Sequence, residues 1–180
     1  MHDESTGGPL DPRLTHLSGS LEMAQARMVD VGAKPPRRRA ALARARLVFP
    51  PGVLAVLLAG RGPKGAVTEV ARIAGILGAK RTSELIPLCH ALALDHVELT
   101  FERVGEDVLE LLCRASSQAA TGVEMESLVG AALAALTVYD MGKGLDKGIR
   151  IERLELLEKQ GGKSGDWRAP QDEPSKGGPA

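Results

Sequence analysis

The stretch from residue 123 to residue 142 constrains the fold more than any other part of the sequence. It is rich in Ala, Leu and Val around the whole circumference of the helix that it would form. A helix that is apolar on most sides has to be covered on most sides by other elements. The sequence therefore predicts a long and largely buried helix here.

The partner of this helix is predicted to be an antiparallel sheet. In residues 96–103, Val97, Leu99 and Phe101 alternate with polar residues, and a turn at 105–107 leads into a second strand pattern at 108–115. Further strands are expected at 27–34, 37–49 and 149–157, and helices at 50–58 and 65–79. This order predicts an α+β fold with helices packed on one face of the sheet.

The chain length of 180 residues suits one domain. Residues 1–19 and 168–180 have no apolar period, so we expect a flexible N-terminal segment and a flexible C-terminal tail around a single domain at 20–167. No stretch has the length of a membrane-spanning helix, and the first residues lack the pattern of a secretory signal. We therefore expect a cytoplasmic protein that does not bind membranes.

Composition limits the partners further. The 23 basic residues balance the 23 acidic residues, so any anion site must be local. Aromatic residues make up 2% of the chain, which argues against base stacking and nucleic-acid binding. The two cysteines and four histidines lack the spacing of a metal site, so we expect reduced thiols and no metal.

A run of arginines invites a different interpretation. Clustered arginines neutralise RNA phosphates, but the neutral total charge favours a solvated strand face from which one arginine could reach a small phosphorylated ligand. The arginines of this run are Arg37, Arg38, Arg39, Arg44 and Arg46.

Several short segments could carry chemistry. An apolar helix pattern ends in a polar cluster before and after Pro87, which favours an anion site, although Lys and Arg also occur at ordinary helix ends. The members of the cluster are Lys80, Arg81, Thr82, Ser83, Glu84, Cys89 and His90.

A lysine and two glycine-rich loops add to these candidates. Lys64 lies in a glycine-rich loop before a helix, where it is either a phosphate ligand or a solvated loop residue. Residues 161–165 do not form a Walker loop, because its first glycine would fall at Leu157. This loop is either a flexible tail or an anion-closing loop that uses Lys163.

Both ends of the long helix carry charge. Asp140 and Lys143 lie on one side of it, either as an acid–base pair or as an ordinary salt bridge, while Thr121 is a possible helix cap. Glu126 and Asp140 are fourteen residues apart on nearly the same stripe, hence roughly 21 Å apart at 1.5 Å per residue. One small ligand can hardly touch both, so we expect a symmetric oligomer with sites at subunit boundaries.

Seven motifs together resemble one family. They are MVDV at 28–31, ARIAGI at 71–76, AKRT at 79–82, LIPLCH at 85–90, TGVEME at 121–126, AALTVYDM at 134–141 and GGKSGD at 161–166. In this order they resemble the cyclic pyranopterin monophosphate synthases, the C proteins (MoaC) of molybdenum cofactor biosynthesis, over residues 14–167.

The resemblance implies a ferredoxin-like subunit in a homohexamer, a trimer of dimers with active sites at subunit interfaces. It also implies a lyase without cofactor that converts (8S)-3′,8-cyclo-7,8-dihydroguanosine 5′-triphosphate to cyclic pyranopterin monophosphate and diphosphate. The competing hypothesis is a non-catalytic nucleotide-binding oligomeric module, because fold alone does not fix function.

Residue roles follow from the motif positions. Asp140, Lys143 and Lys64 match the family's catalytic residues, and the substrate-binding residues are expected to be Leu88, Cys89, His90, Met125, Glu126, Lys80 and Arg39. The chain departs from the family pattern at Ala120, where a basic residue is usual, and at Ala66, Ala91 and Gly142. We expect weaker phosphate binding at Ala120 and looser packing at the other three positions.

Overall fold

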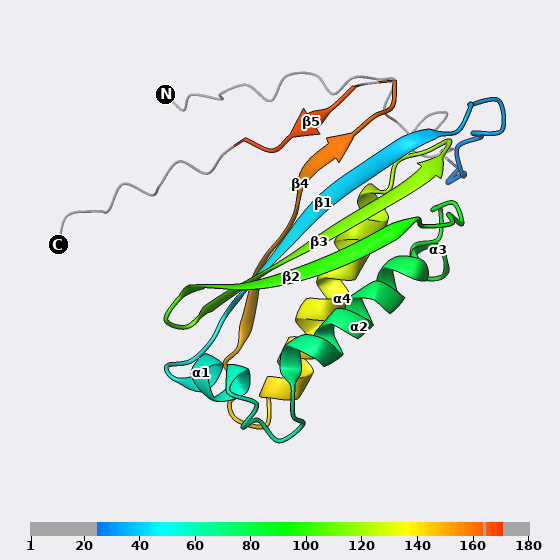
Figure 1. Cartoon of the computed structure of the whole chain (residues 1–180). Coiled ribbons are helices and arrows are strands. Elements are labelled where there is room, and N and C mark those ends of the chain that lie inside the picture. Colours follow the sequence, from blue (N-terminus) through cyan, green and yellow to red (C-terminus); the bar gives the residue numbers. More distant parts are fainter. Residues whose placement is uncertain (1–24, 164, 171–180) are drawn as a thin grey trace, which may run out of the picture.

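A computed structural model describes residues 25–163 and 165–170. In this part of the chain the strands are β1 (Arg37–Val48), β2 (His96–Gly105), β3 (Val108–Ala119), β4 (Arg150–Gln160) and β5 (Trp167–Arg168). The helices are α1 (Val53–Leu58), α2 (Val67–Lys80), α3 (Thr82–Leu85) and α4 (Glu124–Gly142). The strands form one antiparallel sheet in the order β2-β3-β1-β4-β5 (Figure 1).

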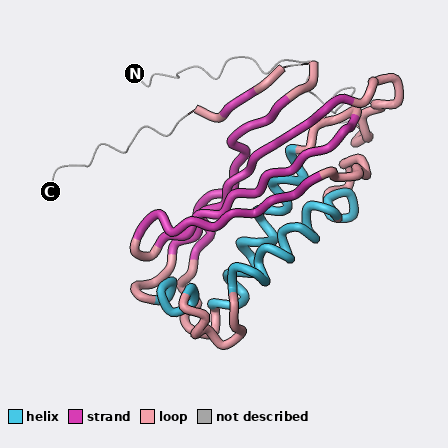
Figure 2. Tube along the Cα trace, viewed as in Figure 1, coloured by secondary structure: helices cyan, strands magenta, loops and turns pink. Residues whose placement is uncertain are grey.

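The two long helices lie side by side over one face of this sheet (Figure 2). Side-chain alternation in β1 explains which face they cover. Ala41, Ala43 and Ala45 are fully buried under the helices, while Leu42, Arg44 and Arg46 on the opposite face remain partly exposed. The sheet therefore has one dry face and one wetter face, as the alternating pattern predicted.

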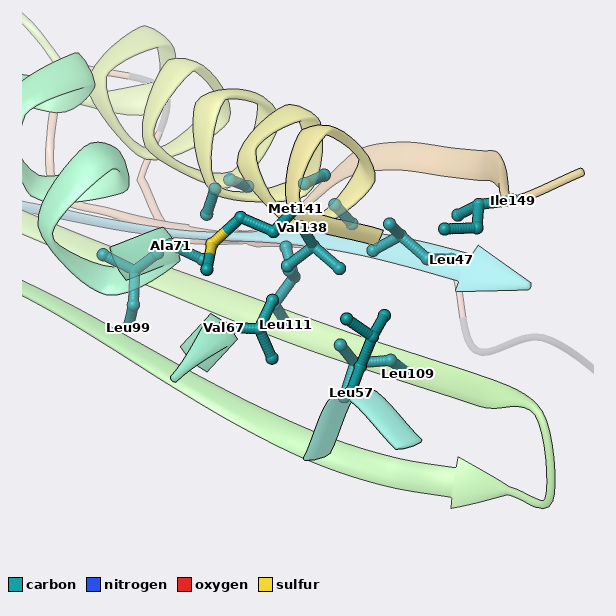
Figure 3. Packing of buried hydrophobic residues seen from close by; sticks show 14 of the residues in the cluster. Leu47, Leu57, Val67, Ala71, Leu99, Leu109, Leu111, Val138, Met141 and Ile149 are labelled. Atoms are coloured by element: carbon teal, nitrogen blue, oxygen red, sulfur yellow. The ribbon is translucent and has the colours of Figure 1, made fainter. Parts of the chain in front are cut away.

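Small residues let α4 approach both α2 and the sheet closely. A Cβ added at Gly75 of α2 would lie 2.8 Å from the carbonyl oxygen of Gly130 in α4. A Cβ added at Gly130 would in turn lie 2.5 Å from Sγ of Cys113 in β3. Leu47, Leu111 and Val138 complete the core between these close contacts (Figure 3). The predominance of apolar and small residues on α4 is thus explained by contacts on several of its sides.

The predicted α+β architecture is confirmed. Helices α1 and α2 follow β1. Strands β2 and β3 form the hairpin, and α4 leads into β4. This βαββαβ order, with β1 between β3 and β4, is the ferredoxin-like arrangement. The observed strands β1 to β4 and helices α1, α2 and α4 overlap the predicted ranges, although β3 runs four residues further than expected, to Ala119.

One predicted strand is wrong. Residues 27–34 form no strand but an irregular segment that ends in a turn. The backbone nitrogen of Gly32 donates to Oδ1 of Asp30 at 2.8 Å, and that of Lys34 donates to the carbonyl oxygen of Val31 at 3.0 Å. These local bonds replace a strand ladder, as is common where an Asp side chain accepts from the backbone nitrogen two residues further on.

Two short elements were missed by the sequence analysis. They are the one-turn helix α3 and strand β5, in which Trp167 and Arg168 pair with Lys159 and Glu158. Strand β5 spans the boundary that we predicted between the domain and its tail. The predicted N-terminal segment 1–19 and the tail from residue 171 onward lie outside the described residues.

Candidate active site

Three charged side chains meet at the C-terminal end of α4. Nζ of Lys64 lies 2.5 Å from Oδ2 of Asp140, and Nζ of Lys143 lies 2.7 Å from Oδ1 of the same carboxylate. Each carboxylate oxygen therefore accepts from a different ammonium group. All three side chains are about half exposed, so a ligand can reach them. We call these three residues the charged cluster.

Local structure explains this meeting. The backbone nitrogen of Gly65 donates to the carbonyl oxygen of Gly62, which closes a turn with Pro63 and Lys64 at its centre. Gly65 has a φ of 83°, a conformation that favours glycine. Lys143 follows the last residue of α4, where the helix dipole favours a positive charge. Lys143 thus lies at the end of α4, and Lys64 lies in the turn between α1 and α2.

The charged cluster shifts the proton affinities of Asp140 and Lys143. Hydrogen bonds from Lys143 and then Lys64 lower the pKa of Asp140 from 3.8 to about 2. The hydrogen bond to Asp140 raises the pKa of Lys143. At neutral pH Asp140 is thus ionised and Lys143 is protonated, which makes Lys143 a proton donor or an anion ligand in the resting state.

A cavity of about 440 Å³ lies near the opposite end of α4. Five residues predicted to bind substrate line it: Leu88, Cys89, His90, Met125 and Glu126. The first three follow α3, and the other two belong to the first turn of α4. The structure therefore brings two predicted segments together around one hollow.

Burial controls the chemistry of this cavity. Only 4% of Glu126 is exposed, and this burial raises the pKa of its carboxyl, with a smaller contribution from Glu124. Burial, and then the charge of Glu126, raises the pKa of the Cys89 thiol. Cys89 is therefore a neutral thiol and a poor nucleophile at neutral pH. Thr121 makes no cap for α4, contrary to one sequence interpretation, and lines the cavity instead.

The N-terminal segment 27–34 forms one wall of the cavity. Nε2 of His90 donates to the carbonyl oxygen of Val29 at 2.8 Å and so fixes this segment beside the loop after α3. Arg27 and Lys34 of the segment line the cavity and bring two positive charges to it. The sequence analysis did not name either among the site residues, because it predicted a strand there; their only signal was the neighbouring MVDV motif.

The other two predicted ligands lie elsewhere. Arg39 of β1 is only 8% exposed, and its Nε donates to the carbonyl oxygen of Ala119 at 3.3 Å. Its guanidinium also borders the glycine-rich loop, since a Cβ at Gly162 would lie 2.5 Å from it. Lys80 is exposed at the end of α2 and does not line the cavity.

The arginines of β1 lie on both faces of the sheet. Arg44 pairs with Glu155 at 2.7 Å, and Arg46 lies 3.4 Å from Glu110. These pairs lie on the sheet face opposite the helices, where the side chains of Arg44 and Arg46 are 19% and 35% exposed, so this face is only partly solvated. Arg39 alone of these three lies buried on the helix-covered side.

The fold, the charged cluster and the cavity together are typical of an acid–base enzyme. A ferredoxin-like α+β subunit carries a carboxylate between two ammonium groups, together with a separate cavity of mixed charge. Such an arrangement suits proton transfer and charge stabilisation on an anionic small molecule.

Comparison with known proteins identifies the family. The MoaC family model matches residues 28–162, and the chain belongs to this family. A cyclic pyranopterin monophosphate synthase of Thermomicrobium roseum is 52% identical over 161 residues, which cover 89% of this chain and 95% of the relative. Proteins with the same name from Chloroflexus aurantiacus and Novosphingobium aromaticivorans are 48% and 49% identical, over 88% and 87% of this chain and 96% and 97% of their own lengths.

None of the helices in residues 25–163 and 165–170 is long and apolar enough to span a membrane.

Proposed function

We propose that this chain is a cyclic pyranopterin monophosphate synthase of molybdenum cofactor biosynthesis. It converts (8S)-3′,8-cyclo-7,8-dihydroguanosine 5′-triphosphate to cyclic pyranopterin monophosphate and releases diphosphate. The observation that carries the proposal is the charged cluster, because Asp140 binds both Lys64 and Lys143 in a chain that is about half identical to proteins of that name. Residues 20–167 form the catalytic domain, and the enzyme is a cytoplasmic lyase that needs no cofactor.

The charged cluster acts on the purine-derived part of the substrate. Opening and reclosing this ring system requires several proton transfers, and a protonated lysine beside a carboxylate can give a proton and take it back. Asp140 keeps Lys143 protonated through its hydrogen bond and accepts a second hydrogen bond from Lys64. We assign the proton transfers to the two lysines and their positioning and tuning to Asp140.

The cavity binds the phosphates and the rest of the substrate. His90, Arg27 and Lys34 supply hydrogen bonds and positive charge, and Leu88, Cys89, Met125 and Glu126 shape the walls. Arg39 lies beside Ala120 and Gly162, where it can take the place of the basic residue that the family usually carries at 120. Lys80 remains a predicted ligand outside the cavity lining.

A complete site requires two subunits. Within one protomer, Glu126 and Asp140 lie in the first and last turns of α4, fourteen residues or roughly 21 Å apart at 1.5 Å per residue. The outer face of the helices exposes Val70, Ile73, Leu77 and Leu136, of which Ile73 is 60% exposed. Exposed apolar side chains of this kind mark protein contacts. We infer a homohexamer, a trimer of dimers, in which the cluster of one subunit meets the cavity of another.

Turnover of the proposed substrate tests this function. The purified chain is incubated with the cyclic nucleotide triphosphate, and diphosphate and the pterin product are measured. We expect both products in equal amounts. Binding of the nucleotide without either product would instead support the non-catalytic binding module.

A further inference from the structure

The charged cluster is built by two chain segments that meet at one buried side chain, Leu57 of α1. Leu57 is 1% exposed and belongs to the main core (Figure 3). A Cβ added at Gly62 would lie 2.9 Å from its Cδ2 methyl, and a Cβ added at Gly142 would lie 2.9 Å from its Cδ1 methyl. The two methyl groups of one leucine therefore face two glycines on different segments.

Both glycines adjoin the reacting groups. Gly62 opens the turn that presents Lys64, through the bond from the Gly65 nitrogen to the Gly62 carbonyl oxygen. Gly142 lies directly before Lys143 and two residues after Asp140. A shift of either segment against Leu57 would change the distance between Lys64 and Asp140.

Close packing explains why glycine occupies these two positions. Neither residue has a positive φ, so backbone freedom does not call for glycine there. A Cβ closer than 3.0 Å to another heavy atom would force a displacement, and at Gly142 it would also lie 2.6 Å from Cδ1 of Ile149. Glycine near a helix end destabilises the helix relative to alanine. The close contact with Leu57 and Ile149 explains why glycine nevertheless occupies position 142.

Apolar packing is also better suited than the ion pairs to hold the two segments together. The side chains of the charged cluster are about half exposed, and exposed ion pairs contribute little to holding a geometry. Burial of a leucine side chain contributes more, and a close-packed interior resists small changes of volume.

We propose that Leu57 is a positioning residue for the reaction. Its two methyl groups act as a spacer that sets how closely the Lys64 turn approaches the end of α4, and Gly62 and Gly142 are the small positions that fit this spacer. Its role in turnover depends on the proposed function, whereas its role in the geometry does not. In this chain Leu57 and Ile149 fill the space beside Gly142, where the family frequently has a cysteine, so the looser packing that we expected at this position is not found.

A size exchange between Gly62 and Leu57 tests the proposal, because Leu57 is the one side chain that a Cβ at Gly62 would meet within 4 Å. Gly62→Ala is compared with Leu57→Val and with the double variant Gly62→Ala/Leu57→Val, whose valine lacks both Cδ methyls. Gly144→Ala is the matched control, since its Cβ would lie at an ordinary 3.4 Å from Pro63.

Two measurements are made on each variant. The Asp140 carboxyl is titrated by carbon NMR, and kcat and KM are determined with the proposed substrate. Gly62→Ala is expected to raise the Asp140 pKa from about 2 towards 3.8 and to lower kcat about 10- to 100-fold with little change in KM. The double variant is expected to return the Asp140 pKa and kcat most of the way to their original values. Gly144→Ala is expected to behave as the unchanged protein.

The outcomes separate the two proposals. An unchanged protein that makes no product contradicts the proposed function, while the NMR titration still tests the spacer. An Asp140 pKa and a kcat that are both unchanged in Gly62→Ala would contradict the positioning role of Leu57. A folded double variant that recovers neither the Asp140 pKa nor kcat would contradict it as well. If Gly62→Ala does not fold, Leu57→Val is the deciding variant. The positioning role predicts a raised Asp140 pKa and a lowered kcat for it, and normal values of both would refute that role.

Discussion

The two ends of α4 carry carboxylates whose proton affinities shift in opposite directions. At the C-terminal end, the hydrogen bonds from two lysines lower the pKa of Asp140 to about 2. At the N-terminal end, burial raises the pKa of Glu126. The helix dipole alone would favour the reverse, since it stabilises negative charge at the N-terminus. The shifts therefore come from hydrogen-bond partners at one end and from burial at the other, in the direction opposite to the preference of the dipole.

This contrast assigns different work to the two ends. The end at Asp140 is solvent-accessible and already holds its cations, so it is ready for proton transfer to a ligand that comes to it. The end at Glu126 is hollow and has a buried acid in its wall, so it suits the binding of a substrate rather than its conversion. Four experiments test this division of roles.

Removal of the Asp140 charge is expected to have the largest effect. Asp140→Asn keeps the shape of the side chain but loses the carboxylate that holds Lys64 and Lys143, so kcat should fall about 100- to 10,000-fold, the range of acid–base contributions. Glu152→Gln, which breaks the exposed pair with Arg150, is the matched control. Turnover of Asp140→Asn close to that of the control would remove Asp140 from the mechanism.

Loss of the two cavity cations should act on binding instead. Arg27→Met/Lys34→Met removes two charges from the cavity wall, and KM is expected to rise about tenfold or more, because hydrogen bonds to charged groups are the stronger ones. The reaction rate at saturating substrate should change little. Arg103→Met, on the β2–β3 hairpin, controls for the loss of a surface charge. A normal KM in the double variant would place the phosphates elsewhere.

The two carboxylates should also give opposite effects of pH on stability. The folded-state pKa of Asp140 is lowered, so its stabilising contribution is present above pH 4 and is lost as the pH falls towards 2. The folded-state pKa of Glu126 is raised above 4.5, so its ionisation destabilises the fold as the pH rises above that value.

Urea unfolding at several pH values and one fixed protein concentration measures this difference. Glu126→Gln is expected to raise the unfolding midpoint at pH 7 but not at pH 4, while Asp140→Asn is expected to flatten the loss of stability between pH 4 and pH 2. A lower midpoint for Glu126→Gln at pH 7 would contradict the assigned shift.

Much of the fold could be predicted from apolar periodicity. The alternation in residues 96–103 and the apolar helix at 123–142 specify their elements, because burial imposes those patterns. Residues 27–34 show the limit of this approach. Val29 and Val31 suggested a strand, but the local bond from Gly32 to Asp30 forms a turn, and it depends on geometry that the apolar pattern does not encode.

The candidate site was only partly predictable. Spacing on one helix placed Glu126 and Asp140 at opposite ends of α4, and the resemblance supplied the roles of individual residues. Neither could show that Lys64 reaches Asp140 from 76 positions away, since that contact depends on how α1 and its following turn pack against α4. The buried position of Arg39 and the wall formed by Arg27 and Lys34 likewise depend on tertiary packing.

Mixing of two variants with complementary defects, assayed at a substrate concentration far below KM, tests whether one active site draws on two subunits. Asp140→Asn spoils the charged cluster and leaves the cavity intact, whereas His90→Ala spoils the cavity and leaves the cluster intact. When equal amounts are unfolded and reassembled together, about a quarter of the sites should combine two intact halves, because subunits associate at random. We predict recovery of about that share of wild-type turnover in the mixture; a mixture no more active than its two components would contradict the shared site.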